Sequence, residues 1–255
     1  MKITLLGTGT SQGVPQIGCD CKVCMSENPK DNRLRSSIMI EVDNQTLVVD
    51  TGPDFRTQML REKVQKVDAI LFTHEHKDHI AGLDDVRAFN HKWKMDMQVF
   101  STERVKQALK REFHYVFSGC DLPGIPKINI NIISNQPFYI NKTEITPIEV
   151  MHHKLSVLGF RINKFAYITD VSFISETEKE KLKNLDVLIL DSLRKKEHLS
   201  HFNLEQSLSL INELNPKKSY LTHISHLMGR EEDVLKELPY NVQFAFDGQK
   251  IFMNE

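Results

Sequence analysis

Three histidines and an aspartate fall within six consecutive positions of the segment Thr73-His74-Glu75-His76-Lys77-Asp78-His79. Imidazole nitrogens and carboxylate oxygens are ligands for divalent metals of intermediate or hard character. The apolar run Val67–Phe72 precedes the segment and predicts a buried strand, and side chains two apart on extended backbone point the same way. His74 and His76 can therefore serve one ion, while Asp78 and His79 follow a turn and can serve another. Because the whole chain has only 11 histidines, this cluster predicts a dinuclear metal site rather than ordinary surface histidines.

Three further candidate ligands each come just after an apolar, strand-like run: His152, Asp170 and His223. A rigid strand fixes the position of the residue at its end, so strand ends suit a functional site. An aspartate after a strand is common by itself, and it is the recurrence alongside the histidine-rich segment that favours function. His152 is followed by His153, and neighbours on a strand point to opposite faces, so only one of them should reach the metals.

A second metal site is predicted by Cys19, Cys21 and Cys24, which lie too close together in sequence for unstrained disulfides. Clustered cysteines in a cytosolic chain more often bind metal. Structural zinc takes four ligands, and His226 is the candidate for the fourth. The remaining cysteine, Cys120, lies in an expected loop and is expected to have no role.

The length, charge balance and apolar content of the chain limit the classes of protein to which it can belong. The chain has 255 residues, of which 40% are hydrophobic, so it can form one large domain or two small ones. Its 33 basic and 34 acidic residues give no bulk attraction to nucleic acid. The start of the chain is too short an apolar run for a signal peptide, and no stretch reaches the roughly 18 apolar residues of a membrane span. We expect a soluble cytoplasmic protein without membrane contact.

Short apolar runs predict strands throughout the chain, and three pairs of them are joined by hairpin signals: Asp43-Asn44-Gln45, Asn163-Lys164 and Asp247-Gly248. The last predicts that Val242–Phe246 pairs with Gln249–Met253. Apolar residues at three-to-four spacing predict helices over residues 54–63, 83–92, 102–115, 175–183, 203–214 and 230–237. We expect an α/β (α+β) fold with two sheets in the middle and helices outside. No long linker separates domains, so one domain over residues 1–255 is expected.

The order and spacing of the candidate ligands resemble the ligand pattern of the metallo-β-lactamase superfamily in its dinuclear hydrolase form. The resemblance implies a four-layer αβ/βα sandwich of two mixed sheets. It also assigns ligands: the first metal takes His74, His76 and His152, the second takes Asp78, His79 and His223, and Asp170 bridges them. Asp50 is expected to orient a ligand or the metal-bound water. The family pattern places the ligand at His152 rather than His153.

The cysteine cluster with His226 narrows the resemblance to PhnP-type phosphodiesterases, which hydrolyse cyclic phosphates of ribose derivatives. This implies a small phosphodiester substrate, two Mn²⁺ or Zn²⁺ ions sharing a bridging hydroxide, one structural Zn²⁺, and a possible homodimer. His201, before an expected helix, matches the histidine that protonates the leaving alkoxide, with His198 as its competitor. His201 and the metal ligand Asp78 are thus the candidate catalytic residues.

Alternative functions share the same metal motif. A tRNA 3′-end processing endonuclease normally adds a protruding RNA-binding arm, which the sequence does not show. PqqB, linked to pyrroloquinoline quinone synthesis, has a similar cysteine pattern. A metal-binding or redox module, as in flavodi-iron proteins, is a non-hydrolase alternative, but no flavodoxin-like region follows the motif.

Overall fold

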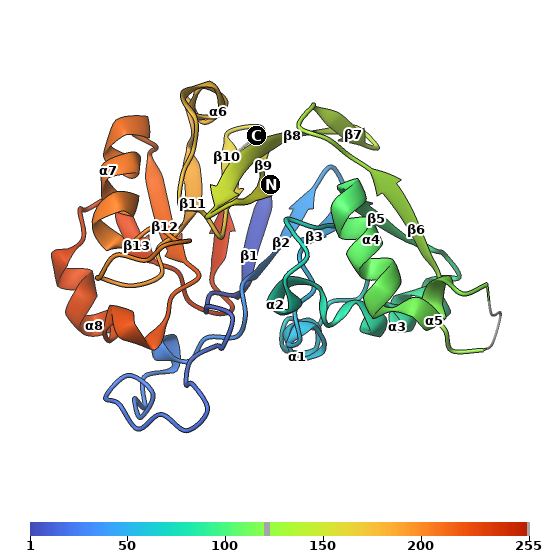
Figure 1. Cartoon of the computed structure of the whole chain (residues 1–255), viewed down its shortest axis with the longest axis horizontal. Coiled ribbons are helices and arrows are strands. Elements are labelled where there is room, and N and C mark those ends of the chain that lie inside the picture. Colours follow the sequence, from blue (N-terminus) through green and yellow to red (C-terminus); the bar gives the residue numbers. More distant parts are fainter. Residues whose placement is uncertain (120–122, 254–255) are drawn as a thin grey trace. The chain divides into compact units, whose positions relative to one another are not determined.

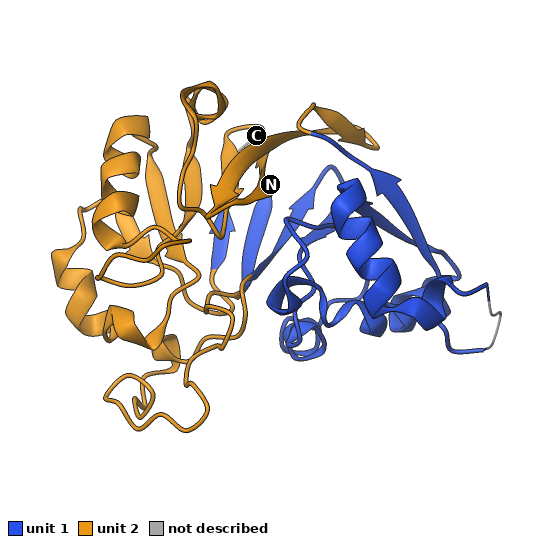
Figure 2. Ribbon diagram, viewed as in Figure 1, with its two compact units in different colours: residues 1–6, 37–134, 250–255 blue, residues 7–36, 135–249 orange. Residues whose placement is uncertain are grey.

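The computed structural model describes residues 1–119 and 123–253, which group into two compact units (Figure 2). Unit 1 contains residues 1–6, 37–134 and 250–255, and unit 2 contains residues 7–36 and 135–249. Each unit has one mixed seven-stranded sheet with helices beside it (Figure 1). The predicted fold class, two mixed sheets with helices, is confirmed, whereas a single folding domain stays a prediction. Cys120 lies outside the described residues.

The sheet of unit 1 has the strand order β14-β1-β2-β3-β4-β5-β6. The strands are β1 (Lys2–Gly7), β2 (Ser37–Val42), β3 (Gln45–Val49), β4 (Ala69–Leu71), β5 (Met97–Ser101), β6 (Ile128–Ile132) and β14 (Lys250–Phe252). The predicted hairpin joins β2 to β3 through Asp43 and Asn44, both with positive φ. From β3 to β6 the pairing is parallel, so the carboxyl ends of β3 and β4 lie at one edge.

The helices of unit 1 are α1 (Phe55–Arg61), α2 (Lys77–Ile80), α3 (Arg87–Trp93), α4 (Glu103–Glu112) and α5 (His114–Phe117), with a 3₁₀ turn η2 (Leu83–Val86) before α3. Fully buried Phe55, Ile70 and Phe72 belong to one apolar cluster that holds α1 against the sheet. The short α2 was not predicted, because its four residues KDHI are too few to show apolar periodicity.

The sheet of unit 2 has the order β13-β12-β11-β10-β9-β8-β7. Its strands are β7 (Phe138–Ile140), β8 (Thr143–His152), β9 (Leu155–Ile162), β10 (Phe165–Ile168), β11 (Val187–Asp191), β12 (Lys218–Thr222) and β13 (Val242–Phe244). Strands β10 to β13 are parallel, and the rest form antiparallel pairs, including the predicted turn at Asn163. Parallel strands are buried on both faces, which explains their continuous apolar sequences.

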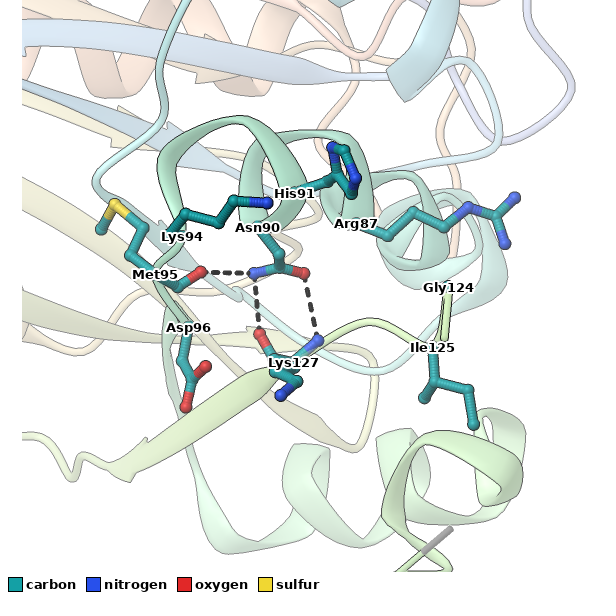
Figure 3. Close-up of a pocket in the computed structure, with 9 residues that line it drawn as sticks. All are labelled: Arg87, Asn90, His91, Lys94, Met95, Asp96, Gly124, Ile125 and Lys127. Carbon is teal, nitrogen blue, oxygen red and sulfur yellow. Dashed lines mark hydrogen bonds between the residues drawn. The ribbon is translucent and has the colours of Figure 1, made fainter. Parts of the chain in front are cut away.

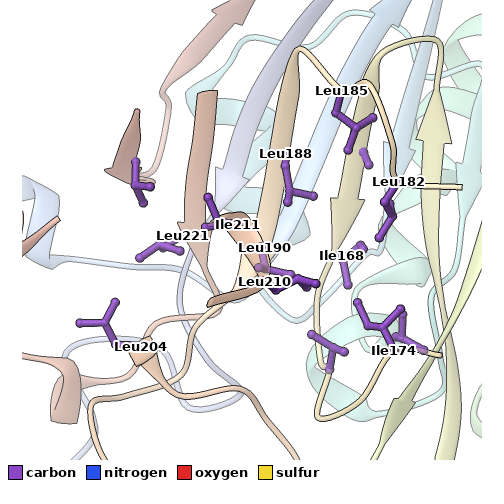
Figure 4. Close-up of a cluster of buried hydrophobic side chains, with 14 of the residues drawn as sticks. Ile168, Ile174, Leu182, Leu185, Leu188, Leu190, Leu204, Leu210, Ile211 and Leu221 are labelled. Atoms are coloured by element: carbon purple, nitrogen blue, oxygen red, sulfur yellow. The ribbon is translucent and has the colours of Figure 1, made fainter. Parts of the chain in front are cut away.

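The helices of unit 2 are α6 (Glu176–Glu180), α7 (Leu204–Leu214) and α8 (Glu231–Val234), with 3₁₀ turns η1 (Pro29–Asp31), η3 (His226–Met228) and η4 (Leu235–Glu237). Leu210 and Ile211 of α7 and Leu190 and Leu221 of the strands belong to one buried cluster (Figure 4). A capping box starts α7, because the Asn203 side chain accepts from the N–H of Gln206 and the Gln206 side chain accepts from that of Asn203.

The predicted hairpin across Asp247-Gly248 is wrong. Strand β13 pairs in parallel with β12, whereas β14 pairs antiparallel with β1, so the two belong to different sheets. The Asp247 carboxylate instead accepts hydrogen bonds from the Thr8 hydroxyl and the Leu34 N–H, both at 2.8 Å. The dipeptide signal describes only the local turn and carries no information on a distant strand partner.

Candidate functional site

The histidine-rich segment of unit 1 links β4 to α2, and its four candidate ligands lie in two pairs. The Nε2 atom of His74 and the Nδ1 atom of His76 are 2.9 Å apart. The Oδ2 atom of Asp78 and the Nε2 atom of His79 are 3.1 Å apart. His74 and His79 are completely buried, so these two candidate ligands lie in a low-dielectric environment. The division of the four residues between two ions stays a prediction.

A single buried carboxylate orients both buried histidines. Asp50, directly after β3, has Oδ2 2.7 Å from His79 Nδ1 and accepts from the Thr73 hydroxyl at 2.8 Å. That hydroxyl lies 2.9 Å from His74 Nδ1, so the His74 Nδ1–H donates to Thr73, which donates to Asp50. Burial raises the pKa of Asp50, while His79 and Thr73 oppose the rise. With both Nδ1 atoms in these contacts, Nε2 of His74 and of His79 is the nitrogen that could bind a metal.

Unit 2 carries the other candidate ligands at its strand ends. His152, the last residue of β8, is buried, and its Nδ1–H donates to the Ser200 carbonyl at 2.7 Å. With Nδ1 as the donor, Nε2 is the nitrogen that could bind a metal. His153 is exposed, with a φ of 55° that turns the chain away from the strand. The two neighbours therefore have different environments, and the local geometry favours His152 as the ligand.

His223 follows β12 and contacts Asp170, which follows β10. The Nδ1 atom of His223 is 3.3 Å from the Thr169 hydroxyl and 3.4 Å from Asp170 Oδ2. The Thr169 hydroxyl donates to Asp170 Oδ2 at 2.7 Å. Both ligand candidates are almost completely buried.

Three candidate residues at the ends of parallel strands have left-handed backbone. The φ angles of Asp50, Asp170 and His223 are 63°, 55° and 57°. A non-glycine residue in this region costs on the order of 1 kcal/mol. The turn redirects each side chain at the point where its strand ends.

His201 lies beside the candidate ligands of unit 2. Its Nδ1 is 3.0 Å from Oδ2 of the fully buried Asp191, at the end of β11. The same oxygen accepts from the Val171 N–H at 3.0 Å. The His201 ring packs 4.5 Å from that of His152 and stacks 4.9 Å from that of His223. Asp191 thus fixes the tautomer of His201 with Nδ1 protonated.

Sequence reasoning missed Asp191. Its only signal was an acid directly after the apolar run Val187–Leu190, the same signal that selected Asp170.

His198, the competitor of His201, has its ring 5.2 Å from that of His201 and accepts from the Ser200 N–H. Burial lowers the pKa of His198, and the neighbouring His201 and Arg194 lower it further.

The cysteine cluster forms a compact donor set within unit 2. The Sγ atoms of Cys19, Cys21 and Cys24 lie 3.2, 3.4 and 3.4 Å from His226 Nδ1. A tetrahedral zinc ion with usual bond lengths requires sulfur-to-nitrogen distances of about 3.6 Å. The Cys24 N–H donates to Cys21 Sγ and lowers the pKa of that thiol to about 6, which favours the thiolate. Three sulfurs and an imidazole in this geometry fit a structural zinc.

Surface hollows occur in both units. One in unit 1 is shaped by Asn90, whose side-chain amide bonds the Met95 carbonyl and both backbone groups of Lys127 (Figure 3). No predicted ligand lines it. A hollow of about 480 Å³ in unit 2 has His201 in its wall.

Among the described helices, none combines the length and apolar character that a membrane crossing requires.

Comparison with known sequences gives a family. A family model described as "Beta-lactamase superfamily domain" matches residues 45–224. An octanoyltransferase of Porphyromonas gingivalis is 36% identical over 258 residues, and this chain spans only 52% of its length. Coenzyme PQQ synthesis protein B of Methylobacterium nodulans is 24% identical over 219 residues, covering 75% of this chain and 72% of the relative.

Three solved protein structures resemble the structure of this chain. The chain is 38% identical to a new diphosphatase from the PhnP family, with a TM-score of 0.93 and coverage of 99% of this chain and 98% of that one. Zinc-bound PqqB from Methylobacterium extorquens has a TM-score of 0.83 at 18% identity over 99% of this chain and all of that one. The short form of human tRNase Z has a TM-score of 0.72 at 17% identity over the full length of both. The last two show only a shared fold.

Proposed function

Because the chain belongs to the β-lactamase superfamily and, within it, to the PhnP family, we propose that this metal-dependent hydrolase is a phosphodiesterase for a cyclic phosphate or another small phosphodiester. The observation that carries the proposal is the Asp191–His201 pair beside His152 and His223. Cleavage of a phosphoester releases an alkoxide, a poor leaving group that needs a proton. A buried histidine held by a carboxylate can supply that proton.

We propose two divalent ions, Mn²⁺ or Zn²⁺, with ligands assigned as the family pattern implies. One ion takes His74, His76 and His152, the other takes Asp78, His79 and His223, and Asp170 is shared. The donor set of imidazoles and carboxylates suits either metal. When bound, such ions acidify water and neutralise the negative charge of a phosphoryl group.

The chain's own residues prepare these groups. Asp50 holds His79 directly and His74 through Thr73, and the Ser200 carbonyl holds His152, so each Nε2 is available as a ligand. Asp191 accepts from Nδ1 of His201 and stabilises its imidazolium form. His201 then gives its Nε2 proton to the leaving oxygen.

Diphosphate hydrolysis is the second candidate, because the 38% identical relative of the PhnP family is a diphosphatase. The two reactions differ in the leaving group. A phosphate is a weaker base than an alkoxide and needs protonation less. Dependence on His201 therefore separates them.

The test is turnover of bis(p-nitrophenyl) phosphate, a ribose cyclic phosphate and a diphosphate diester, each with added Mn²⁺ or Zn²⁺. We expect turnover of the phosphodiesters with at least one metal. Hydrolysis of the diphosphate alone would favour the second candidate, and no turnover with any divalent metal would refute both.

A further inference from the structure

We propose, resting on the proposed phosphodiesterase function, that Thr10 is a further catalytic residue, whose hydroxyl donates a hydrogen bond to a phosphoryl oxygen of the substrate. Thr10 belongs to unit 2 and is half-buried. Its Oγ1 atom lies 3.3 Å from Nε2 of the candidate ligand His223. This hydroxyl is therefore next to a nitrogen that could bind a metal, although Thr10 is not one of the assigned ligands.

The contacts of His223 determine which partner donates in this hydrogen bond. The Thr169 hydroxyl gives its proton to Oδ2 of Asp170 at 2.7 Å, so it can only accept from Nδ1 of His223, 3.3 Å away. The same Asp170 oxygen lies 3.4 Å from Nδ1 and is a second acceptor. A neutral imidazole with Nδ1 protonated has Nε2 as its acceptor, and the Thr10 hydroxyl is therefore the donor.

A metal ion on Nε2 of His223 and the Thr10 hydroxyl compete for one lone pair. Coordination by a neutral imidazole uses that lone pair, so it ends the hydrogen bond from Thr10. Within residues 1–119 and 123–253, this hydroxyl has no other hydrogen-bond partner. A donor released beside a metal site can serve an oxygen atom of a bound phosphoryl group. Because that oxygen is negatively charged, the hydrogen bond is about twice as strong as one between neutral groups.

The backbone around Thr10 is held in place by the chain itself. The Thr10 N–H donates to the Ile224 carbonyl at 3.1 Å, and the Thr10 carbonyl accepts from the Gly13 N–H at 2.8 Å. At the preceding residue, Gly9, a Cβ atom would lie only 2.8 Å from the Arg33 carbonyl oxygen, so the loop packs too closely there for a side chain. Only the side chain of Thr10 has to turn towards a substrate, and a donor on a fixed backbone is effective in catalysis.

Thr10→Val tests the assignment, because it removes the hydroxyl and keeps the shape of the side chain. We expect kcat/KM to fall at least about tenfold for both a ribose cyclic phosphate and bis(p-nitrophenyl) phosphate, since the phosphoryl oxygens are common to the two substrates. The affinity of the metal-loaded protein for inorganic phosphate, measured by calorimetry, should fall as well. Thr10→Ser keeps the donor and should remain within about threefold of wild type in each measurement.

The metal-free protein gives a measurement that does not depend on turnover. Thr10→Val should bind Mn²⁺ as tightly as wild type or more tightly, because the ion no longer displaces a hydrogen bond from Nε2 of His223. Weaker binding of Mn²⁺ would mean that Thr10 supports the metal and would overturn the proposal. Unchanged kcat/KM and unchanged phosphate affinity would overturn it too.

Thr57→Val is the matched control, because Thr57 is an exposed residue of α1 in unit 1. It should leave turnover, phosphate affinity and Mn²⁺ affinity unchanged. A wild-type protein that hydrolyses no phosphodiester with any divalent metal would overturn the proposed function instead. The phosphate affinities of wild type and Thr10→Val would then still decide whether this hydroxyl contacts a phosphoryl group.

Discussion

At the scale of single residues, three of the buried candidate ligand histidines have a polar partner on Nδ1. Asp50 contacts His79 directly and His74 through Thr73, and the Ser200 carbonyl accepts from His152. The sequence identifies candidate ligands from their types and spacing. It could not identify Ser200, because a backbone carbonyl has no sequence signature, nor Asp191, because a single acid after a strand is common.

Replacing the proposed acid should separate substrates by leaving group. His201→Ala is expected to lower turnover of a ribose cyclic phosphate about a hundredfold or more, the usual contribution of general acid catalysis. The loss on bis(p-nitrophenyl) phosphate should be much smaller, since p-nitrophenolate leaves without a proton. Asp191→Asn should also lower turnover of the ribose cyclic phosphate more than that of bis(p-nitrophenyl) phosphate. Both decreases should be smaller than with His201→Ala, because the amide only removes the charge that stabilises the imidazolium form of His201.

His91→Ala serves as the control, because His91 is an exposed residue of α3 in unit 1. Metal content of each variant is measured in parallel with its rate. Loss of metal by His201→Ala would reassign this residue as a ligand, and equal losses on both substrates would argue against an acid.

At the scale of elements, the sequence predicted the strands well because parallel strands buried on both faces are continuous apolar runs. β11, from Val187 to Asp191, is an example. The partner of a strand was less predictable. The Asp247-Gly248 turn joins strands of different sheets, since the pairing of β14 with β1 is set by tertiary contacts.

The cysteine cluster ties the segment after β1 to the end of β12. Besides the sulfur contacts to His226, the Thr10 N–H donates to the Ile224 carbonyl and the Ile224 N–H donates to that of Thr8. Cys21→Ser should therefore lose one zinc per chain and unfold at a lower temperature, because metal binding contributes to folding. Metal analysis and thermal unfolding measure the two effects. Cys120→Ser is the control, and a zinc content of Cys21→Ser equal to wild type would refute the site.

Helix α6 is attached to β8 through Glu178. This carboxylate accepts from the Glu149 N–H and the Asn135 amide, both at 2.8 Å, and pairs with Lys181 at 2.9 Å. Burial alone would raise the pKa of Glu178, but these hydrogen bonds outweigh it and lower the pKa below its ordinary value.

A lowered pKa means that the carboxylate stabilises the fold above its unfolded pKa, and that this contribution is lost as the pH falls through the folded pKa. Glu178→Gln should cost about 1 kcal/mol at neutral pH and have less effect at acid pH. Denaturant unfolding at several pH values measures the difference. A cost independent of pH would show that charge is not the cause.

At the scale of the whole molecule, fold class and family could be predicted because ligand residues spread from His74 to His223 act as one long-range pattern. The grouping of the chain into two units could not. Unit 1 includes both ends of the described chain through β1 and β14, a pairing between residues about 250 positions apart that leaves no local signal.

The proposal implies three metal ions per chain in two chemical classes. Imidazole and carboxylate sites should lose their ions to a chelator more readily than the thiolate site, which holds zinc more firmly. Dialysis against EDTA should leave about one zinc per chain and abolish turnover, and Mn²⁺ or Zn²⁺ should restore it. Full activity after removal of all but this zinc would contradict the metal dependence.

The left-handed backbone of Asp50, Asp170 and His223 has an evolutionary consequence. Glycine adopts this conformation without the steric cost that a side chain adds. In a lineage that kept the fold but no longer needed the reaction, substitution to glycine at these three positions would relieve strain at no cost to activity. Such residues at the ends of β3, β10 and β12 in a relative would therefore mark a pseudoenzyme, and their replacement could be followed through a phylogeny as a record of when activity was lost.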